Sequence, residues 1–379
     1  MMKIVVNAQC LIKDKLEGLG WFSYETLKRI TTQHPEHQFV FVFDRKWDQS
    51  FIFSDNIKPI ILYPPSRHPF LWHIRFDELF PFLLLKHKAD LYLSPDGWMP
   101  LHTKVKTVNV IHDLNFEYYP QYLPFWYRNY YRMYFPRFAR KATRLATVSE
   151  YSKTDIIAKY KVAPEKIDVV YNGCNELYKP ADPDVKKSTI QKYSNGHPYF
   201  VFVGSLHPRK NLINLFRAFE LFKEKQHSDI KLLIVGGKKW WTTEIDSTFE
   251  NMRHKEDLYF TGHVSSAEMN DIIGSALAMT YVSCFEGFGI PILEAFYCET
   301  PLITSNVTSM PEIAGNAALL ADPFSVDSIA GAMLKIADNE TLRQELIAKG
   351  RIRRQEFSWQ KSADKLWKCV EKAVDNTNL

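Results

Sequence analysis

The sequence predicts an α/β protein built from two doubly wound parallel sheets, and three observations lead to this fold class. Short apolar runs typical of buried strands alternate with longer amphipathic stretches along the chain. The second half repeats the plan of the first. The length of 379 residues suits two domains, because one domain typically holds about 100 to 200 residues.

The expected strands follow the apolar runs in order. In the first half they are 3–8, 38–43, 91–94 and 107–111, and in the second half 199–203, 231–235, 258–260, 277–282 and 301–304. Amphipathic helical stretches such as 212–224 separate them. The segment 178–184 is rich in proline and charge and has no apolar period, which favours a linker. We therefore expect domains at 1–180 and 181–356.

The composition is that of a soluble globular protein, and we expect a cytoplasmic location. The apolar start 3–6 runs directly into Asn7 and Gln9, unlike a signal peptide, and the apolar run 79–85 is too short to span a bilayer. The net charge of +5, with acids and bases mixed, does not indicate nucleic-acid binding. The cysteines are scattered and never form a C-x-x-C pair, which argues against disulfides or a zinc site: Cys10, Cys174, Cys284, Cys298 and Cys369.

The most informative stretch begins at Glu286 and ends at Glu294, directly after an apolar run typical of a buried strand. Gly287 and Gly289 allow backbone conformations closed to other residues, and Pro291 suits the first turn of a helix. The N–H groups at such a helix start hold phosphate well. Because a phosphate would repel Glu294, we expect this carboxylate to hold a neutral hydroxyl such as that of a ribose, and Glu286 to hold a second hydroxyl-rich group. Alternatively, Glu294 only complements the helix dipole and Glu286 is solvated.

The first strand of the second half also ends in residues that suit chemistry. It runs into Gly204 and Ser205, and Arg209 and Lys210 follow just before a helix expected from Asn211. Two cations at a strand end can clamp a diphosphate, arginine through its bidentate fork and lysine as a point charge. The alternative is a pair of solvated surface cations.

In the first half, the strand 107–111 ends in His112 and Asp113. An imidazole there can bind a sugar hydroxyl or shuttle a proton. Alternatively, the histidine is structural and Asp113 caps the next helix. Nearer the start, Gly18 and Gly20 precede a helical pattern and permit a close approach of the backbone to a ligand.

The segment 116–144 is crowded with aromatic and basic residues and holds a single acid. Arg128, Arg132 and the pair Arg140 and Arg144 recur at helical spacing, which predicts a basic stripe beside an aromatic one. Such a helix can dock an anionic lipid-linked acceptor or a membrane surface. A core helix with a solvated basic edge is the alternative.

Signatures of several other chemistries are missing or misplaced. Asp182-Pro183-Asp184 has the D-x-D spacing by which some sugar-transfer enzymes hold a divalent metal, but it lies in the expected linker, away from any strand end. The sequence contains no P-loop, H-E-x-x-H zinc helix or G-x-S-x-G elbow. Nucleotide hydrolysis, zinc proteolysis and serine esterase chemistry therefore lack their usual signatures.

Together these motifs resemble those of the retaining glycosyltransferases of the GT-B fold, in particular glycosyltransferase family 4, along nearly the whole chain. The most specific part is the E-x7-E motif from Glu286 to Glu294. The other matches occur in the family's order, as Gly18 with Gly20, His112-Asp113, Val148-Ser149-Glu150, Gly204 with Arg209-Lys210-Asn211, Ser305-Asn306 and Pro311-Glu312. One departure is Trp21, at a position where family members often carry a basic residue.

The resemblance implies a fold and a reaction. Two Rossmann-like domains face each other across a cleft, the first binding the acceptor and the second a nucleotide-sugar donor, and a closing segment 357–379 crosses back to the first domain. The reaction is hexosyl transfer by front-face attack with retention of configuration, without a metal or other cofactor. GDP-mannose is our choice of donor, and the acceptor is a glycan or lipid-linked molecule in cell-surface polysaccharide synthesis.

The resemblance also assigns roles in the donor-binding domain. Arg209 and Lys210 neutralise the leaving diphosphate, Glu294 holds the ribose and Glu286 holds the transferred sugar. The remaining donor-binding positions supply mainly backbone groups to the sugar and phosphates: Gly204, Ser205, Gly287, Phe288, Gly289 and Ile290.

From the first domain, Gly18 and Gly20 close over the phosphates and His112 contacts the donor sugar near the reacting carbon. His112, Arg209, Lys210 and Glu286 are thus the expected catalytic residues.

Two other functions stay open at this point. A non-catalytic nucleotide or sugar-binding protein of the same fold would keep the site and lack turnover. A dinucleotide oxidoreductase would need a short connection from the first strand to the glycines, and the connection from Gln9 to Glu17 is long. An oxidoreductase of that kind also needs an acid at the end of the second strand, and Asp44 partly meets this condition.

Overall fold

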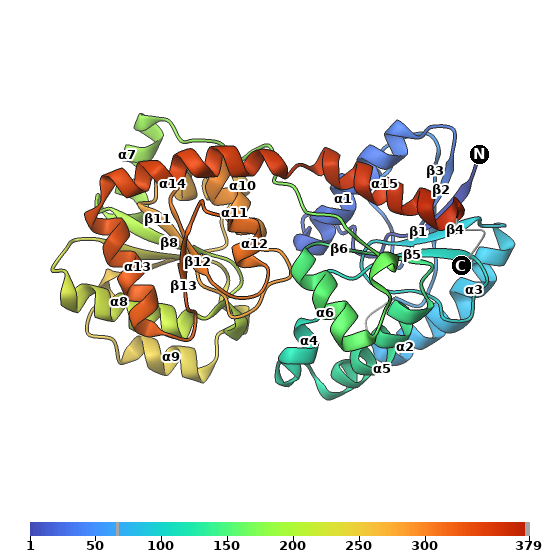
Figure 1. The fold of residues 1–379 in the computed structure, drawn as a ribbon, viewed down its shortest axis with the longest axis horizontal. Helices are drawn as coiled ribbons and strands as arrows, with labels where there is room; N and C mark the ends of the chain where they lie inside the picture. The colour runs from blue at the N-terminus through green and yellow to red at the C-terminus, as the bar shows by residue number, and fades with distance from the viewer. Residues whose placement is uncertain (66–67, 376–379) are drawn as a thin grey trace. The chain divides into compact units, whose positions relative to one another are not determined.

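The computed structural model describes residues 1–65 and 68–375. They form two compact units (Figure 1). Unit 1 comprises Met1–Gly173 together with the chain from Ser358 onward, and unit 2 comprises Cys174–Phe357. Each unit contains one sheet whose strand pairs are all parallel. The predicted α/β class with two doubly wound sheets is confirmed.

In unit 1 the described residues form a seven-stranded sheet in the order β3-β2-β1-β4-β5-β6-β7. The order reverses between β1 and β4, whose carboxyl ends therefore flank the place where doubly wound sheets bind ligands. The strands are β1 (Lys3–Asn7), β2 (Gln38–Phe43), β3 (Ile57–Ile61), β4 (Leu91–Ser94), β5 (Lys106–Val110), β6 (Arg144–Thr147) and β7 (Ile167–Val169).

Helices cover both faces of this sheet (Figure 1). The apolar core on one face is built from strand residues and from α2, α3, α5 and α6, while α1 and α15 lie side by side on the other. The helices are α1 (Gly18–Gln33), α2 (Pro69–His73), α3 (Phe80–Lys86), α4 (Asn115–Tyr118), α5 (Phe125–Lys141), α6 (Glu150–Tyr160) and α15 (Trp359–Asp375), with a π-helical segment, Ile74–Leu79, between α2 and α3.

In unit 2 the described residues form a six-stranded sheet in the order β10-β9-β8-β11-β12-β13, which reverses between β8 and β11. Its strands are β8 (Tyr199–Val203), β9 (Lys231–Val235), β10 (Leu258–Gly262), β11 (Ala278–Tyr281), β12 (Leu302–Ser305) and β13 (Leu319–Ala321). Its helices are α7 (Pro183–Ser194), α8 (Leu212–Lys225), α9 (Thr243–Glu250), α10 (Ser266–Ser275), α11 (Ile290–Tyr297), α12 (Met310–Ala314), α13 (Val326–Asp338) and α14 (Glu340–Arg353).

Four strands were not foreseen from the sequence: β3, β6, β7 and β13. Strand β3 carries Pro59 and lies at the edge of its sheet, where a missing N–H donor is tolerated. Strands β7 and β13 have three residues each, too few to show a period of two. Strand β6 was not predicted because its first residue, Arg144, was assigned to a helix.

The placement of Arg144 on a helical basic stripe is wrong. Helix α5 ends at Lys141, and Arg144 opens β6 with an exposed fraction of 8%. Its Nη2 donates a hydrogen bond of 2.6 Å to Asp168 Oδ2 on β7, so the charge is paired inside the sheet. Arg128, Arg132 and Arg140 do lie on α5.

The division between the units falls at Gly173 and Cys174, earlier than the expected boundary at 180. The segment after Cys174 packs on unit 2: the Lys179 N–H donates to Asn270 Oδ1 at 2.7 Å, and Ala181 contacts Gly274 of α10. Asp182 is the N-cap residue of α7, which begins at Pro183, so the expected linker is partly a helix start.

The last helix, α15, belongs to unit 1 and packs on α1 and on strands β5, β6 and β7. Its Ser362 hydroxyl donates to the carbonyl of Tyr171. Gly173 lies so close to Trp359 that a Cβ would be 2.3 Å from the Trp359 nitrogen. Residues 376–379 of the predicted closing segment lie outside the described residues. None of the helices in the described part of the chain is both long and apolar enough to cross a bilayer.

Gly236, directly after β9, is required by a close approach of two backbone segments. Its φ is +155°, and an added Cβ would lie 2.0 Å from the carbonyl oxygen of Gly204. We expect Gly236→Ala to lower the free energy of unfolding by about 1 to 3 kcal/mol, because a backbone oxygen cannot rotate away.

Denaturant unfolding monitored by circular dichroism measures this change. Gly331→Ala in α13 is the matched control, since no heavy atom lies within 4 Å of its added Cβ and alanine favours helices by roughly 0.5 to 1 kcal/mol. A Gly236→Ala variant as stable as wild type would contradict the close approach.

Candidate functional site

The candidate site of unit 2 lies where β8 and β11 end, at the reversal point of its sheet. After β8 the chain forms a short 3₁₀ turn, Pro208–Lys210, that carries both expected cations. Asn211 follows with a φ of +66°, and its side-chain amide donates to the carbonyls of Val282 (3.0 Å) and Pro323 (2.7 Å). These bonds fix the turn against the segments that follow β11 and β13.

Glu286 lies between the two cations. Its Oε1 is 2.7 Å from Lys210 Nζ, and its Oε2 is 2.7 Å from Arg209 Nη1. Lys210 also donates to the hydroxyl of Tyr281 at 2.9 Å, and Arg209 donates to the carbonyl of Phe285 at 2.7 Å. The structure thus brings Arg209, Lys210 and Glu286 together as predicted from their places at strand ends, and adds Tyr281, which no sequence motif had marked.

The cluster of Arg209, Lys210 and Glu286 is mostly buried, and the charges of its cations set the pKa of Glu286. Glu286 has an exposed fraction of 7% and Lys210 one of 9%. Burial raises the pKa of Glu286, but Arg209 and Lys210 outweigh it and hold the pKa at about 2. Burial and the same two cations lower the pKa of the adjacent His207 to about 4. At neutral pH the cluster therefore carries two positive charges and one negative charge.

Glu286 is therefore not solvated. Its carboxylate is already paired with Arg209 and Lys210 before any sugar binds. Its carboxylate holds the two cations at one point, and the net charge of this group of three residues remains positive. An incoming diphosphate can share or take over the contacts to Arg209 and Lys210, since phosphate oxygens are acceptors of the same kind. The alternative that these cations are solvated surface residues is therefore wrong.

Glu294 lies one turn into α11, as expected for the second acid of the motif. Burial raises its pKa to about 7, although the Tyr178 hydroxyl and Lys210 act in the opposite direction. Tyr178 was assigned to a linker from its sequence context, and the structure places it beside Glu294 instead. A carboxyl group with such a pKa changes its charge near neutral pH, where a ribose ligand would need its ionised form.

We expect donor binding through Glu294 to depend on pH. Below a pH of about 7 the carboxyl becomes protonated and loses acceptor capacity, so the KM for the donor should rise as the pH falls. In Glu294→Gln the KM should be raised about tenfold or more, for one lost charged hydrogen bond, and should no longer change across neutral pH. Steady-state kinetics at several pH values test this, and an unaltered profile in the variant would exclude the assigned role.

The chain between the two glutamates is closely packed. Phe285 and Phe288 have exposed fractions of 3% and 4%. Gly289 has a φ of +96° and is the N-cap residue of α11, which begins at Ile290, one residue before the expected Pro291. The Ser309 hydroxyl, from the loop after β12, donates to the carbonyls of Glu286 (2.9 Å) and Phe288 (3.1 Å).

On the other side of the site, Gly204 follows β8 with a φ of +144°, and Ser205 beside it is exposed. Both of these predicted donor-binding positions thus lie at the same sheet edge as Lys210, whose Cε is 3.8 Å from a Cβ built on Gly204. The backbone contacts to a donor assigned to Gly204, Ser205 and 287–290 stay predictions.

The first-domain residues lie at the corresponding edge of unit 1. Gly18 and Gly20 form the first turn of α1 and not a loop before it. His112 follows β5, and its Nε2 is 2.8 Å from the carbonyl oxygen of Pro95; burial lowers its pKa. Asp113 accepts a hydrogen bond from the Asn115 N–H at 2.9 Å, but the N-cap residue of α4 is Leu114, so Asp113 lies one residue before the cap position considered for it.

Asp96 is a residue of this edge that the sequence analysis missed. It is buried, its pKa is raised by that burial, and its carboxylate accepts hydrogen bonds from Asn7, Gln9 and Ser94. The signal was available, because Asp96 lies two residues after the end of β4, at the reversal point of the sheet.

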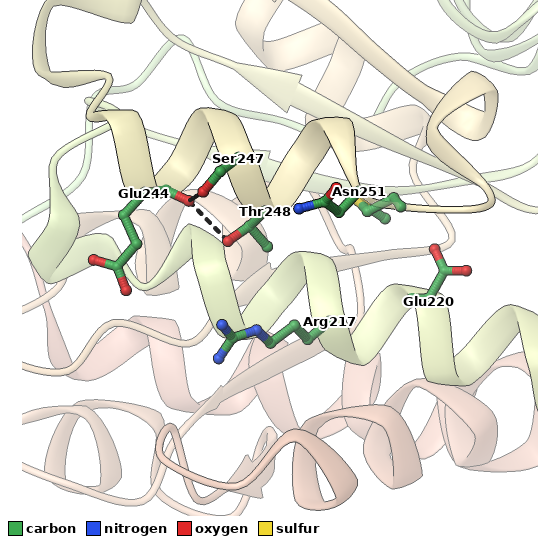
Figure 2. A pocket seen from close by; sticks show the side chains of 7 residues that line it. Arg217, Glu220, Glu244, Ser247, Thr248 and Asn251 are labelled. Carbon is green, nitrogen blue, oxygen red and sulfur yellow. Dashed lines mark hydrogen bonds between the residues drawn. The ribbon is translucent and has the colours of Figure 1, made fainter.

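A hollow on unit 2 lies elsewhere, between α8 and α9. Figure 2 shows Arg217 and Glu220 on one helix and Glu244, Ser247 and Thr248 on the other, where the Thr248 hydroxyl donates to the Glu244 carbonyl at 2.8 Å. None of the predicted site residues lines it. A smaller hollow in unit 1 is lined by Leu16 and Trp21, next to the two glycines of α1.

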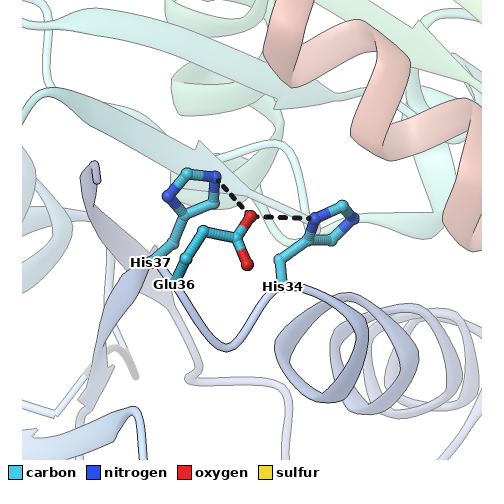
Figure 3. Close-up of side chains that lie close together, drawn as sticks. All are labelled: His34, Glu36 and His37. Carbon is cyan, nitrogen blue, oxygen red and sulfur yellow. Dashed lines mark ion pairs between the residues drawn. The ribbon is translucent and has the colours of Figure 1, made fainter.

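One cluster in the described part of the chain brings three potential metal ligands together, His34, Glu36 and His37 (Figure 3). His37 Nδ1 accepts the Met2 N–H at 3.0 Å, so in the neutral ring Nε2 carries the proton and faces Glu36 Oε1 at 3.3 Å. A metal-binding histidine normally donates its second N–H instead. The two rings stack on Trp367 of α15, with centroid distances of 3.8 and 5.2 Å, and packing explains the cluster.

Two family models match the chain, one in each unit. Residues 25–176 match Glycosyltransferase Family 4, and residues 185–353 match Glycosyl transferases group 1. With its two Rossmann-like units, the protein is a hexosyltransferase of the GT-B fold, as the sequence predicted. The chain belongs to the glycosyltransferases of the family 4 type.

Relatives and solved structures agree with this class. The chain is 27% identical to the O-antigen chain mannosyltransferase B of Escherichia coli, over 95% of this chain and 97% of that protein. It is 28% identical to the O-antigen chain mannosyltransferase RfbU of Salmonella typhimurium, over 71% of each.

Among solved structures, sucrose-phosphate synthase of Thermosynechococcus elongatus has a TM-score of 0.78 at 18% identity, covering 98% of this chain and 99% of that one. Anabaena HepE in complex with UDP and glucose has a TM-score of 0.76 at 16% identity, covering 98% and 100%.

Proposed function

We propose that this protein transfers mannose from GDP-mannose to a glycan or lipid-linked acceptor in the synthesis of a cell-surface O-antigen polysaccharide. The observation that carries the proposal is the cluster of Arg209, Lys210 and Glu286 at the reversal point of the second sheet, where a nucleotide diphosphate would bind. The choice of mannose follows the O-antigen mannosyltransferases to which the chain is similar.

The proposed reaction moves one hexose between two oxygen atoms. The acceptor hydroxyl oxygen forms a bond to the anomeric carbon on the face that the leaving group vacates, while the bond from that carbon to the diphosphate breaks. The electron pair stays on the diphosphate, and a diphosphate oxygen takes the acceptor proton, so configuration is retained. His112 lies near the reacting carbon in this scheme and holds a sugar hydroxyl.

Arg209 and Lys210 stabilise the charge that develops on the leaving diphosphate, which is transition-state stabilisation by preorganised cations. We propose that no metal is needed for this step, because the cations already supply the positive charge. Glu286 positions both cations and, once the diphosphate has taken them over, is available to sugar hydroxyls. Glu294 holds the ribose.

We also propose that the protein works in the cytoplasm. In the described part of the chain all five cysteines are free thiols, and Cys174, Cys298 and Cys369 are buried, the usual state in a reducing compartment.

A panel of nucleotide sugars tests the proposal. The whole chain is incubated with GDP-mannose, UDP-glucose, UDP-galactose or GDP, and its thermal unfolding is followed, since a ligand that binds only the native state raises the unfolding temperature. Donor consumption is then measured with and without EDTA. The expected result is stabilisation by GDP and GDP-mannose and turnover of GDP-mannose that EDTA does not change.

Other outcomes separate the alternatives. Stabilisation without any turnover, in the presence of a membrane extract that supplies acceptors, would favour the non-catalytic binding protein. Preference for a UDP-sugar would overturn the choice of donor, and loss of turnover with EDTA would overturn the metal-independent mechanism.

A further inference from the structure

The smaller hollow of unit 1 lies beyond the carboxyl ends of β1 and β2, on the side of the sheet where doubly wound domains bind ligands. Its volume is about 230 Å³. Clefts that take drug-sized ligands hold about 300 to 1000 Å³, so this hollow suits a ligand of a single ring and not a whole nucleotide. Its lining comes from the loop after β1, the start of α1 and a short 3₁₀ turn after β2: Lys13, Asp14, Leu16, Trp21, Tyr24 and Ser50.

Two aromatic side chains form one wall of this hollow. Trp21 and Tyr24 lie about one turn apart on α1, and their rings meet edge to face with 5.9 Å between centroids and 82° between planes. Tyr24 also packs against Phe51 and Phe53, at centroid distances of 6.3 and 5.2 Å. Both wall residues are half-buried. Rings that are already fixed in this way lose little conformational freedom when a ligand packs on them.

The hollow also presents polar groups that the fold leaves unused. Across residues 1–65 and 68–375, neither the indole N–H of Trp21 nor the hydroxyl of Tyr24 has a hydrogen-bond partner. In the same ranges the carboxylate of exposed Asp14 accepts no hydrogen bond and forms no ion pair. The N–H, the hydroxyl and the carboxylate are therefore available to a ligand.

The positive charge at the hollow is already neutralised. Lys13 Nζ lies 2.9 Å from Asp48 Oδ2, and Oδ1 of the same carboxylate accepts the backbone N–H and the hydroxyl of Ser50 at 3.0 and 2.7 Å. With Asp14 included, the hollow and Asp48 together carry a net negative charge. This charge repels a phosphate or a nucleotide, whereas neutral hydroxyl groups can donate hydrogen bonds to it.

We propose that the hollow binds one neutral hexopyranose ring of the glycan acceptor, and its role toward an acceptor rests on the proposed function. A hexopyranose has C–H groups on its faces, which pack on an aromatic ring, and hydroxyls around its edge. These hydroxyls donate to the carboxylate of Asp14 and accept from Trp21 Nε1. Such a site selects the acceptor by its sugar, independently of the donor bound in unit 2.

Saturation-transfer NMR of the whole chain tests the sugar site without donor or turnover. The probes are methyl α-mannoside, methyl α-glucoside and mannotriose, each added alone. Magnetisation passes from the protein to those ligand protons that contact it. We expect signals from the ring C–H groups of at least one probe, with a dissociation constant in the millimolar range. Absence of a signal from all three probes would overturn the proposal.

Three variants test the assigned residues. Trp21→Ala removes the ring and should weaken binding about tenfold or more, as expected when a large apolar contact is lost. Trp21→Phe keeps a ring and loses only the N–H, so it should bind about threefold more weakly. Asp14→Asn suits the φ of +58° at this position but loses the charge, and should bind about fivefold more weakly. Thermal unfolding confirms that each variant folds.

Matched controls lie outside the hollow. Trp126→Ala removes a tryptophan with an exposed fraction of 65%, and Asp229→Asn neutralises an exposed aspartate of unit 2. Glu286→Gln changes the donor site of unit 2. All three should bind the probes like wild type. Wild-type binding by Trp21→Ala, or a loss in any control equal to that in Trp21→Ala, would place the sugar elsewhere and overturn the proposal.

A second readout connects the hollow with the acceptor. In Trp21→Ala, the amount of membrane extract that gives half-maximal transfer should rise about tenfold, while the KM for GDP-mannose stays unchanged. An unchanged requirement for the extract would overturn the acceptor role. Absence of transfer by the wild-type chain would instead overturn the proposed function, and the NMR titrations alone then decide whether the hollow binds a sugar.

Discussion

Replacing Lys210 by methionine is expected to lower kcat/KM for hexosyl transfer by on the order of a hundredfold or more. Methionine keeps much of the length of the side chain that lies over the Tyr281 ring, but removes the charge 2.7 Å from Glu286. Loss of one preorganised charge-stabilising group typically costs a factor of about 100 to 1000. The fold should survive, because Glu286 keeps its ion pair with Arg209.

The measurement is donor turnover under initial-rate conditions, accompanied by thermal unfolding of the same preparation. Lys349→Met is the control, since this lysine pairs with Glu345 on the exposed face of α14. If Lys210→Met folded and turned over the donor at the wild-type rate, the role assigned to this cation would be wrong.

Replacing Glu286 by alanine is expected to destabilise unit 2 by about 3 to 5 kcal/mol, the usual cost of removing one partner from a buried ion pair. Two cations, Arg209 and the nearly buried Lys210, would be left without their shared carboxylate. Activity should fall as well, because the cations lose their common anchor.

Urea unfolding measures this loss, read from the transition assigned to unit 2, since a chain of two units need not unfold in one step. Glu250→Ala, on an exposed pair with Lys255, should change stability by less than about 1 kcal/mol. A double variant, Lys210→Met/Glu286→Gln, should lose less stability than the sum of its single changes. Equal losses at Glu250 and Glu286 would show that the cluster does not stabilise the fold.

The pH dependence of stability has a definite sign. The pKa of Glu286 in the folded protein is about 2, below its ordinary value of 4.5. The ionised carboxylate therefore stabilises the fold fully above pH 4.5, and this contribution is lost as the pH falls toward about 2. Glu286→Gln should remove that part of the acid sensitivity.

The sequence predicted the site in unit 2 largely because its residues occupy strand ends. Arg209, Lys210 and Glu286 follow β8 and β11, and parallel strands bring their carboxyl ends to one edge. Their mutual ion pairing could not be read from the sequence, since each was expected to face a ligand. Tyr281 escaped notice because a tyrosine inside an apolar strand has the same pattern as any core residue.

Other misses have equally local causes. Tyr178 lies in a segment whose prolines and charges are typical of a linker, and only tertiary packing shows that it lies beside Glu294. Arg144 shares helical spacing with Arg140, but the chain leaves α5 at Lys141 and enters β6. Spacing alone cannot show where a helix ends when no glycine or proline marks the end.

A crystal structure of the protein with GDP bound tests the central claim most directly. We predict that the diphosphate lies within hydrogen-bond distance of Arg209 and Lys210, with the ribose hydroxyls against Glu294 and the Glu286 carboxylate sharing the two cations with the diphosphate. A diphosphate bound elsewhere, for example between α8 and α9, with the contacts of Glu286 to both cations unchanged, would contradict the assignment of the donor site.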